Sequence, residues 1–447
     1  MRAIVYFALP FLLVPFAACG DDDDAMGNGG SAGVAGKGAS GGGSSGAAGK
    51  GAAGSSGSAG QGGSAGTGAG ASGTAGGSGA AGSAGSAGQG GSGGQPLPGE
   101  PTLTRTLLLG GLSHPWDIAF LPGEQRALVT ERSGKLSLVD TAGKQTPVEG
   151  PTDVLANGEG GLLGLTLDPQ FATNRRVYTC FSHAAGGDGV DDTRVVRWRL
   201  SDDAARLEQR LDIVTAMPRN PSGRHSGCRL LFGADGFLYV GTGDSAQGAN
   251  PQDLTSLGGK VLRVTSDGTA APGNPDVKGK DPRVFTYGHR NIQGLALQPG
   301  TGRVYSGEHG PDVDDEINFV QAGKNYGWNP VPGYNETVPM TDLGAFPDAV
   351  SAAWSSGDPT RALSGITFLA HPSWRDWTGA LVGAELKFRR LRVLKLSADG
   401  TTSTELKELF VDQAVRLRTV VLGPDGALYV ATDNKPGGDE IWRVVAQ

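Results

Sequence analysis

Histidine is scarce in this chain, with six residues in 447. None lies in a His-Glu-x-x-His zinc motif, and none is matched to a serine or cysteine in a nucleophile-elbow motif. The chain also lacks a Gly-x-Gly-x-x-Gly run that leads from a strand into a helix, which argues against a nicotinamide-binding Rossmann domain. Lysine and arginine form no basic stripe interleaved with aromatic residues, and the net charge is −7, so we expect no nucleic-acid partner.

The apolar run at the N-terminus is too short to span a bilayer comfortably, and Pro10 and Pro15 interrupt it. Arg2 precedes the run, and small residues lead into Cys19, as in a bacterial lipobox, where the cysteine becomes the lipidated first residue. We therefore predict a signal peptide with a lipobox at residues 1–19, and a lipoprotein of the bacterial cell envelope that faces the periplasm or the cell exterior. The alternative is a secretory signal in which Cys19 is incidental.

Residues 20–97 consist almost entirely of glycine, alanine and serine. Such a segment buries too little apolar surface to offset its conformational entropy, so we expect a disordered tether followed by a folded domain at residues 98–447. Apart from Cys19, the chain has two cysteines, Cys180 and Cys228. In an oxidising compartment they could pair, but their spacing is equally compatible with two free buried thiols.

A repeated pattern runs through the folded part. Each copy has a short apolar strand, a turn rich in proline, aspartate and glycine, a second strand, and then a third strand with alternating residues. Helical periodicity is weak, and six copies spaced about 45–70 residues apart match four-stranded blades with insertions. We therefore predict an all-β fold, a six-bladed β-propeller of four-stranded antiparallel blades, with its function on loops around the central channel. The hairpins begin at Asp117, Leu163, Arg229, Gly294, Gly365 and Val420.

The segment 307–330 is dense in carboxylates. Glycine and proline bend its backbone so that carbonyl oxygens can point outward, and oxygen ligands at this density suit a hard cation such as Ca²⁺. The alternative is a solvated acidic loop. The carboxylates are Glu308, Asp312, Asp314, Asp315 and Glu316.

Three other segments carry polar groups near expected strand ends. The cluster around Arg290 and Asn291 fits either a planar polar ligand or hydrogen bonding between blades. Arg416 and Arg418 lie two residues apart and so share one face of an extended segment, which suits carboxylate binding, although a pair of surface arginines is the simpler alternative. His225 lies among glycine and serine before an apolar run, where it could be a general base or a polar turn residue.

Taken together, these segments resemble the soluble, pyrroloquinoline-quinone (PQQ)-dependent aldose dehydrogenases, also called glucose/sorbosone dehydrogenases. The resemblance extends from Leu112 to Val445. The motifs that carry it are HPWDIAFLP, GEGGLLGLTLDPQF, HSGCRLLFGADGFLYVGTGD, GGKVLRV, GHRNIQGLA, EHGPDVDDEIN, GKNYGW, LKFRRL and RLRTVVLGPDGALYV.

The resemblance implies a six-bladed propeller and a set of site residues. It makes His225 the catalytic base and assigns Arg290 both to catalysis and to holding the quinone. The other residues that it assigns to the cofactor are Glu159, Asn291, Lys387, Arg416 and Arg418, with Gly310 and Pro311 for a cofactor-linked Ca²⁺, and Asp315, Glu316 and Tyr326 for a structural Ca²⁺.

The function implied is oxidation of an aldose at its C1 hydroxyl to a lactone, with hydride transfer to PQQ and onward transfer of electrons to an external acceptor. The chain departs from the family pattern near the base, where Arg224 precedes His225 and Cys228 stands for a usual glycine, and Glu159 stands for a usual glutamine. Two alternatives are a Ca²⁺-dependent lactonase-type propeller, which needs a central metal held by several blades, and a non-catalytic propeller that binds sugar or protein.

Overall fold

The structure is a computed structural model that describes residues 98–186 and 189–447. The predicted signal peptide, the lipobox at Cys19 and the predicted tether lie outside the described residues. Within those residues, no helix is both long enough and apolar enough to cross a membrane.

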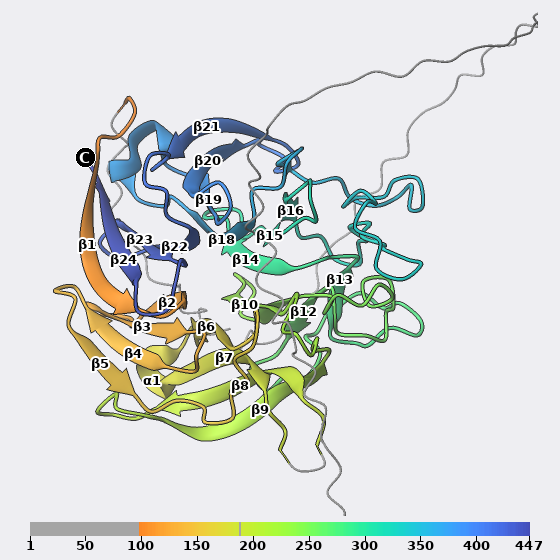
Figure 1. Ribbon diagram of the computed structural model, residues 1–447, viewed down its shortest axis with the longest axis horizontal. Coiled ribbons are helices and arrows are strands. Elements are labelled where there is room, and N and C mark those ends of the chain that lie inside the picture. The colour runs from red at the N-terminus through yellow and green to blue at the C-terminus, as the bar shows by residue number, and fades with distance from the viewer. Residues whose placement is uncertain (1–97, 187–188) are drawn as a thin grey trace, which may run out of the picture. The chain divides into compact units, whose positions relative to one another are not determined.

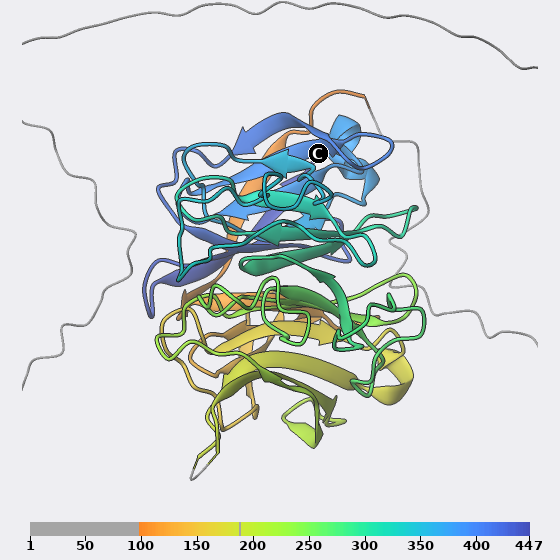
Figure 2. The same ribbon diagram turned by 90° about the vertical axis from the view of Figure 1, so that its right-hand side faces the viewer.

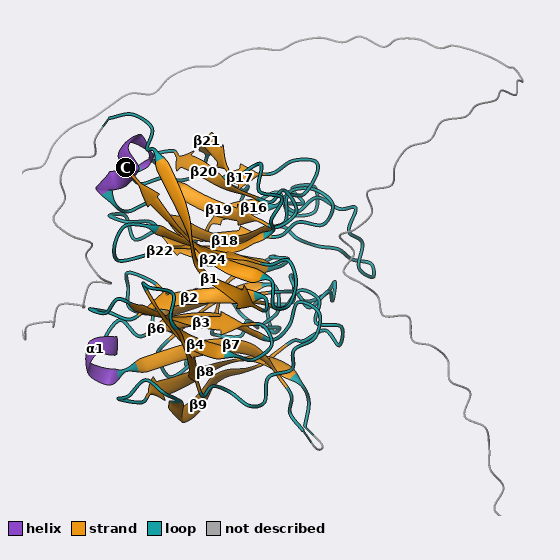
Figure 3. Cartoon of the chain, turned by 60° about the vertical axis from the view of Figure 1, so that its left-hand side comes forward, coloured by secondary structure: helices purple, strands orange, loops and turns teal. Residues whose placement is uncertain are grey.

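Six four-stranded antiparallel sheets surround a common centre (Figure 1). Helix is limited, in the described part, to α1 (Phe171–Asn174) and one 3₁₀ helix (Pro372–Trp377), as Figure 3 shows. The predicted all-β, six-bladed propeller is therefore confirmed. The hairpins that begin each sequence repeat form the first two strands of each blade, and the alternating segments form the third.

The strands of the first three blades are β2 (Pro115–Phe120), β3 (Arg126–Glu131), β4 (Leu136–Asp140) and β5 (Gln145–Val148); β6 (Leu162–Leu167), β7 (Arg176–His183), β8 (Asp192–Leu200) and β9 (Leu207–Met217); and β10 (Gly227–Phe232), β11 (Leu238–Thr242), β12 (Lys260–Val264) and β13 (Val284–Tyr287). Those of the last three blades are β14 (Ile292–Leu297), β15 (Val304–Glu308), β16 (Glu316–Phe319) and β17 (Trp354–Ser355); β18 (Leu363–Phe368), β19 (Leu381–Glu385), β20 (Arg390–Leu396) and β21 (Ser403–Leu409); and β22 (Leu417–Leu422), β23 (Leu428–Thr432), β24 (Asp439–Ala446) and β1 (Leu103–Leu112).

The last blade is completed by the first strand. β1 pairs antiparallel with β24, so that Leu103 lies opposite Ala446, and Thr102 and Gln447 exchange two main-chain hydrogen bonds. The ring is thus closed by main-chain hydrogen bonds between segments at opposite ends of the domain. This closure removes the exposed sheet edges that an open array would present.

Packing between blades buries both faces of the sheets. Apolar side chains from neighbouring blades form continuous clusters, such as the one that joins Tyr178 of β7 with Leu230 of β10 and Val240 of β11. Burial on both faces explains why the inner strands are rich in apolar residues. The tight turn between β10 and β11 uses Gly236 in a left-handed conformation, with φ of +77°, which glycine adopts at no steric cost.

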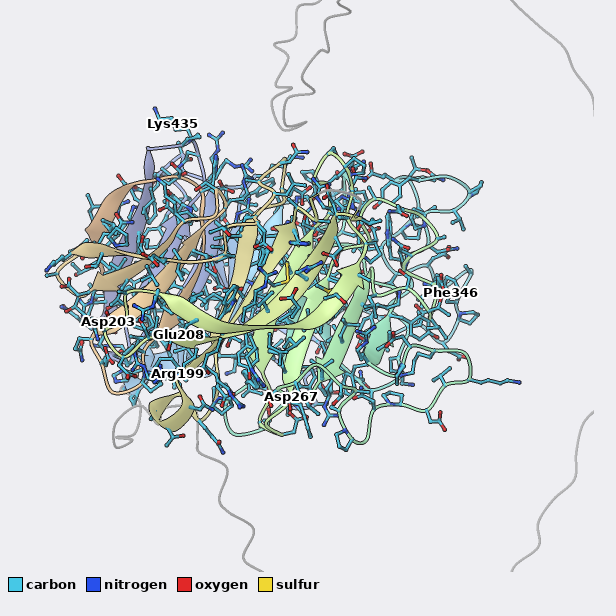
Figure 4. All side chains as sticks on the ribbon, turned by 90° about the horizontal axis from the view of Figure 1, so that it is seen from below. Arg199, Asp203, Glu208, Asp267, Phe346 and Lys435 are labelled. Carbon is cyan, nitrogen blue, oxygen red and sulfur yellow. A yellow bond between two sulfur atoms is a disulfide. The ribbon has the colours of Figure 1, made fainter. Side chains whose placement is uncertain are left out.

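The antiparallel order gives the ring two distinct faces, which Figure 2 shows with the ring turned edge-on. In every blade the innermost strand begins, and the second strand ends, at the same face, which we call the site face. Figure 4 shows Lys435, which follows β23, on this face, and Asp203 and Asp267, from loops that follow third strands, on the opposite one.

Candidate active site

The predicted cofactor and base residues all lie at the site face. The chain enters an innermost strand within three residues after Glu159, His225, Asn291 and Arg416, and Lys387 follows the end of a second strand. Loops from five blades therefore converge around the central channel. This convergence requires antiparallel hairpins and does not depend on the distance between the residues in sequence.

His225 pairs with a carboxylate that the sequence analysis did not single out. Its Nδ1 lies 2.8 Å from Oδ1 of Asp244, which follows β11, the hairpin partner of the strand that begins after His225. Both side chains are buried. A carboxylate at Nδ1 holds the proton on that nitrogen and leaves Nε2 as a proton acceptor. The hairpin itself was the available signal, because Asp244 ends the GTGD motif opposite the histidine.

The surroundings of His225 keep its imidazole neutral. Burial lowers its pKa below the ordinary value of 6.5, and the nearby Arg290 guanidinium lowers it further, while Asp244 and Glu159 act in the opposite direction. Neutral imidazole is the form that accepts a proton. His225 also adopts a left-handed backbone with φ of +54°, a conformation that is uncommon outside glycine and clusters at functional sites.

A long connection between β16 and β17, residues 320–353, crosses the site face and covers this pair. The Trp328 indole donates to Oδ2 of Asp244 at 2.8 Å, and the Tyr334 hydroxyl donates to the same oxygen at 2.7 Å. The Tyr334 oxygen also lies 2.8 Å from Nδ1 of His225. Trp328 belongs to the GKNYGW motif, but no sequence pattern marked Tyr334.

Arg290 is buried, yet part of its guanidinium has no partner. One terminal nitrogen donates to the His309 carbonyl at 2.8 Å, and the other donates to Oε1 of Glu336 at 2.5 Å. Its Nε is buried without a hydrogen-bond partner among the described residues. A buried donor in this state is costly unless a ligand satisfies it.

Asn291 connects the segment that carries His225 to Glu159. Its Oδ1 accepts from the Gly227 amide at 3.0 Å, and its Nδ2 donates to Oε2 of Glu159 at 3.0 Å. Burial opposes ionisation of the Glu159 carboxyl, but His225, His309 and the Asn291 hydrogen bond together hold its pKa below the usual value. Glu159 is therefore an anion at neutral pH, where a glutamine would be neutral.

The predicted cations differ in environment. Arg418 is buried, donates to Oδ2 of Asp433 at 2.8 Å through Nε, and reaches Oε1 of Gln293 at 2.7 Å. Burial opposes ionisation of Asp433, but the Arg418 charge holds the pKa of that carboxyl well below its usual range. Arg416 is half-buried and donates to the Asp433 carbonyl at 3.0 Å, while Lys387 is exposed at the rim of the site face.

Gly310 and Pro311 lie directly after β15, next to the carbonyl of His309 that holds Arg290. The Gly310 amide donates to Oδ1 of Asp315 at 2.9 Å, and Nδ1 of His309 lies 2.7 Å from the Gly310 carbonyl. Asp315 also accepts from the Thr360 hydroxyl and the Arg361 and Leu363 amides. Both oxygens of Asp315 are thus occupied, by its own loop and by the segment that leads into β18.

Glu316 lies instead with a carboxylate that was not assigned a role, Glu308. One Asn318 amide nitrogen donates to both carboxylates, at 2.9 Å to Glu308 and 3.1 Å to Glu316, and the Asn318 Oδ1 is buried without a partner among the described residues. Burial raises the pKa of Glu316 to about 8, and Glu308 adds to the shift. The Tyr326 ring stacks on His289, which contacts Glu308, with ring centres 4.4 Å apart.

Cys180 of β7 and Cys228 of β10 form a disulfide between neighbouring blades. The open question of their pairing is therefore settled in favour of the bond. Cys228 stands three residues after His225, so the cross-link anchors the segment that carries this histidine.

Within the described residues, one group of three side chains has the spacing of a metal site: His114, Asp433 and Asp439. Its carboxylates already have partners, because Asp433 pairs with Arg418 and Asp439 accepts from the His114 and Asn434 amides. It does not supply the central, multi-blade metal that a lactonase-type site requires.

Residues 112–443 match the family model described as glucose/sorbosone dehydrogenase. The aldose sugar dehydrogenase YliI of Escherichia coli is 35% identical over 345 residues, which cover 75% of this chain and 91% of that protein. The crystal structure of the E. coli enzyme in its apo form superposes with a TM-score of 0.70 at 34% identity, over 77% of this chain and 100% of that one. The PQQ-bound aldose sugar dehydrogenase of Streptomyces coelicolor gives 0.63 at 32% identity, over 78% of this chain and 100% of that one. Because the motifs, the six-bladed ring and these matches agree, the chain belongs to the glucose/sorbosone dehydrogenase family.

Proposed function

We propose that this protein oxidises the C1 hydroxyl of an aldose sugar to the lactone, with PQQ as the hydride acceptor and His225 as the general base. The observation that carries the proposal is the buried His225–Asp244 pair beside the Arg290 guanidinium, at the face where five blades bring their loops together. The PQQ-bound state of the Streptomyces relative supports the choice of cofactor.

The side chains present fit PQQ, which is a planar quinone that carries carboxylates. Arg290 offers a buried Nε without a partner among the described residues, next to the amide of Asn291, and these two would hold the quinone. Lys387, Arg416 and Arg418 would hold the carboxylates, because cations with directed donors are the usual partners of such anions.

Two positions fit Ca²⁺. Gly310 and Pro311 follow His309, whose carbonyl accepts from Arg290, so a cation on their carbonyls would act on a cofactor held by that arginine. At the second position, one amide nitrogen of Asn318 links the buried carboxylates of Glu308 and Glu316, and the oxygen of the same amide is buried without a donor among the described residues. Carboxylate and amide oxygens are the ligands that a hard cation prefers. In this proposal Glu308 joins Glu316 and Tyr326, while Asp315 stabilises the loop.

The proton step follows from the geometry of His225. The C1 hydroxyl of the sugar would give its proton to Nε2, while Asp244 holds Nδ1–H and stabilises the imidazolium that forms. Bound PQQ supplies the acceptor for the hydride that leaves C1. Loss of one proton and one hydride turns the hemiacetal carbon into the lactone carbonyl, so atoms and charge balance. The Arg290 guanidinium would stabilise the negative charge that develops across the site.

The test is an absorbance spectrum of the purified protein with PQQ and Ca²⁺, followed by a panel of aldoses with a redox dye. We expect stoichiometric PQQ binding, and reduction of bound PQQ by at least one aldose. Absence of PQQ binding at saturating Ca²⁺ would contradict the proposal. Hydrolysis of lactones by a metal-only preparation would favour a lactonase. Sugar binding by an unmodified protein that shows no redox activity, with binding that survives in H225A, would favour a non-catalytic propeller.

We also propose that the protein works outside the cytoplasm, anchored through lipid on Cys19. The disulfide between Cys180 and Cys228 supports this location, because such bonds persist in oxidising compartments. In a bacterial host, metabolic labelling with a palmitate analogue should mark the full chain in the membrane fraction. C19A should release unlabelled protein, and labelling that persists in C19A would contradict the anchor.

A further inference from the structure

The carboxylate of Glu336 connects two arginines on either side of the catalytic base. Its Oε1 accepts from the Arg290 guanidinium at 2.5 Å, and its Oε2 accepts from the Arg224 guanidinium at 2.6 Å. Burial opposes ionisation of Glu336, but its hydrogen bond to Arg224 and the charge of Arg290 lower its pKa, so it is an anion at neutral pH. No feature of the sequence marked Glu336.

Glu336 is brought to this position by the connection 320–353. The segment runs along the outermost strand of the third blade, β13, where the Tyr326 and Trp328 amides donate hydrogen bonds to the Tyr287 and Gly288 carbonyls. Tyr334 then reaches Asp244 at 2.7 Å, and the Arg224 guanidinium stacks over its ring at 5.4 Å. Glu336, two residues later, is therefore held beside Arg224 and Arg290, the residue next to the base in the chain and the guanidinium that acts on it.

The orientation of Arg290 depends on this contact. One terminal nitrogen is held by the His309 carbonyl and the other by Glu336, so both ends of the guanidinium are occupied and the unpartnered Nε points elsewhere. Glu336 also lies against a buried positive charge that lowers the pKa of His225. Its own negative charge offsets part of that effect.

We propose that Glu336 is a positioning residue of the site: it orients Arg290 toward the cofactor, offsets its charge next to His225, and is itself held by Arg224 on the solvent side. This inference rests on the proposed function. The other groups that face His225 are Asp244 after β11, Tyr334 from the long connection, Glu159 before β6 and Arg290 before β14, and the proposed variants leave all of them in place.

The first test uses the protein without cofactor and follows the His225 imidazole by NMR titration, with H225N to assign the signal. E336Q removes the anion beside Arg290, so the imidazolium loses stabilisation and the His225 pKa should fall. R224Q removes a cation, so that Glu336 pairs with Arg290 alone. The His225 pKa should then rise. If the ion pair were purely structural, the two variants would differ from the unmodified protein in melting temperature, but the His225 pKa would not shift in opposite directions.

Glu208 provides a matched control. Its carboxylate also contacts two arginines, Arg199 at 2.7 Å and Arg206 at 3.6 Å, and its side chain is 29% exposed against 30% for Glu336. In Figure 4 Glu208 lies toward the face of the ring opposite to the one that carries Lys435. E208Q removes the same charge and should leave the His225 titration unchanged.

The second test separates orientation from charge. E336D keeps the anion but is too short to hold both arginines, so the His225 pKa should remain near that of the unmodified protein. In the loaded enzyme kcat should then fall on the order of tenfold, with little change in KM for the sugar, because Arg290 acts on charge that develops in the transition state.

The outcomes distinguish this inference from the proposed function. If the unmodified protein binds no PQQ, the proposed function is wrong. If it binds PQQ and oxidises sugar, while E336Q and R224Q leave the His225 titration where it was and E336D keeps full kcat, then Glu336 is not a positioning residue.

Discussion

Asp244 and His225 face each other across a hairpin, one after the end of β11 and the other before the start of β10, with 2.8 Å between Oδ1 and Nδ1. The pair is buried, and the aspartate receives three further hydrogen bonds, from Trp328, Tyr334 and the Ala246 amide. A histidine held in this way has one tautomer and one free nitrogen, which is the arrangement that a general base requires.

Replacing Asp244 should impair catalysis more than binding. D244N keeps the size of the side chain but loses the anion that stabilises the imidazolium, so kcat should fall by about 100-fold or more. The affinity for PQQ, measured by titration of its absorbance, should remain within a few-fold. A variant that folds normally and keeps full kcat would show that Asp244 does not support the base.

The pH profile should reflect the environment of His225. Its pKa lies below 6.5 because of burial and Arg290, so the neutral base persists below that pH. The acid limb of kcat/KM should therefore fall at a pH lower than 6.5. Folding stability should also decrease at low pH. As pH decreases, the unfolded chain takes up a proton on His225 before the folded protein does, so the contribution of neutral His225 to stability is lost below about pH 6.5. An acid limb above pH 7 would contradict this assignment.

Lys387 and Arg418 should respond differently to truncation. Lys387 is exposed, so K387A should weaken PQQ binding by about tenfold without a change in melting temperature. R418A removes the arginine that pairs with buried Asp433 and leaves His114 as a side-chain partner. Removal of one partner from a buried ion pair typically costs about 3–5 kcal/mol, so R418A should lower both PQQ affinity and stability. Equal losses of stability in the two variants would contradict the difference in environment.

The Glu308–Glu316 pair predicts how Ca²⁺ removal acts. The pKa of Glu316 is raised to about 8, so between its ordinary value of 4.5 and pH 8 the folded state binds more protons than the unfolded chain. Stability of the Ca²⁺-free protein should therefore decrease as pH rises through this window. E316Q should relieve that decrease and should also abolish stabilisation by added Ca²⁺, both measured by thermal unfolding. Ca²⁺ stabilisation that is unchanged in E316Q would place the ion elsewhere.

The disulfide should support both stability and the base. Replacing Cys180 and Cys228 with serine removes a cross-link between residues 48 apart, which typically costs about 2–4 kcal/mol. Because Cys228 follows His225 closely, kcat should fall more than PQQ affinity. Treatment of the unmodified protein with dithiothreitol should reproduce the effect, and the double serine variant should be insensitive to it.

Several residues of the proposed site could be selected from the sequence because they lie in short motifs at strand ends that resemble the family's motifs. His225, Arg290, Asn291 and Arg418 are of this kind, since hairpin grammar already placed them at the start of inner strands. Glu336 and Tyr334 could not be found in this way. They lie in a long connection without periodicity, and their contacts join positions about a hundred residues apart in the chain.

By itself, the sequence determined the number of blades, the all-β fold and the chemical types gathered at one end of the strands, because alternation, turn residues and repeat length are local properties. Tertiary structure alone decided the closure of the ring by β1 and β24, the bond between Cys180 and Cys228, the pairing of Glu316 with Glu308, and the placement of Glu336 between Arg224 and Arg290. These depend on contacts between segments far apart in the chain, whose partners are specified by how the blades pack and not by the residues next to them.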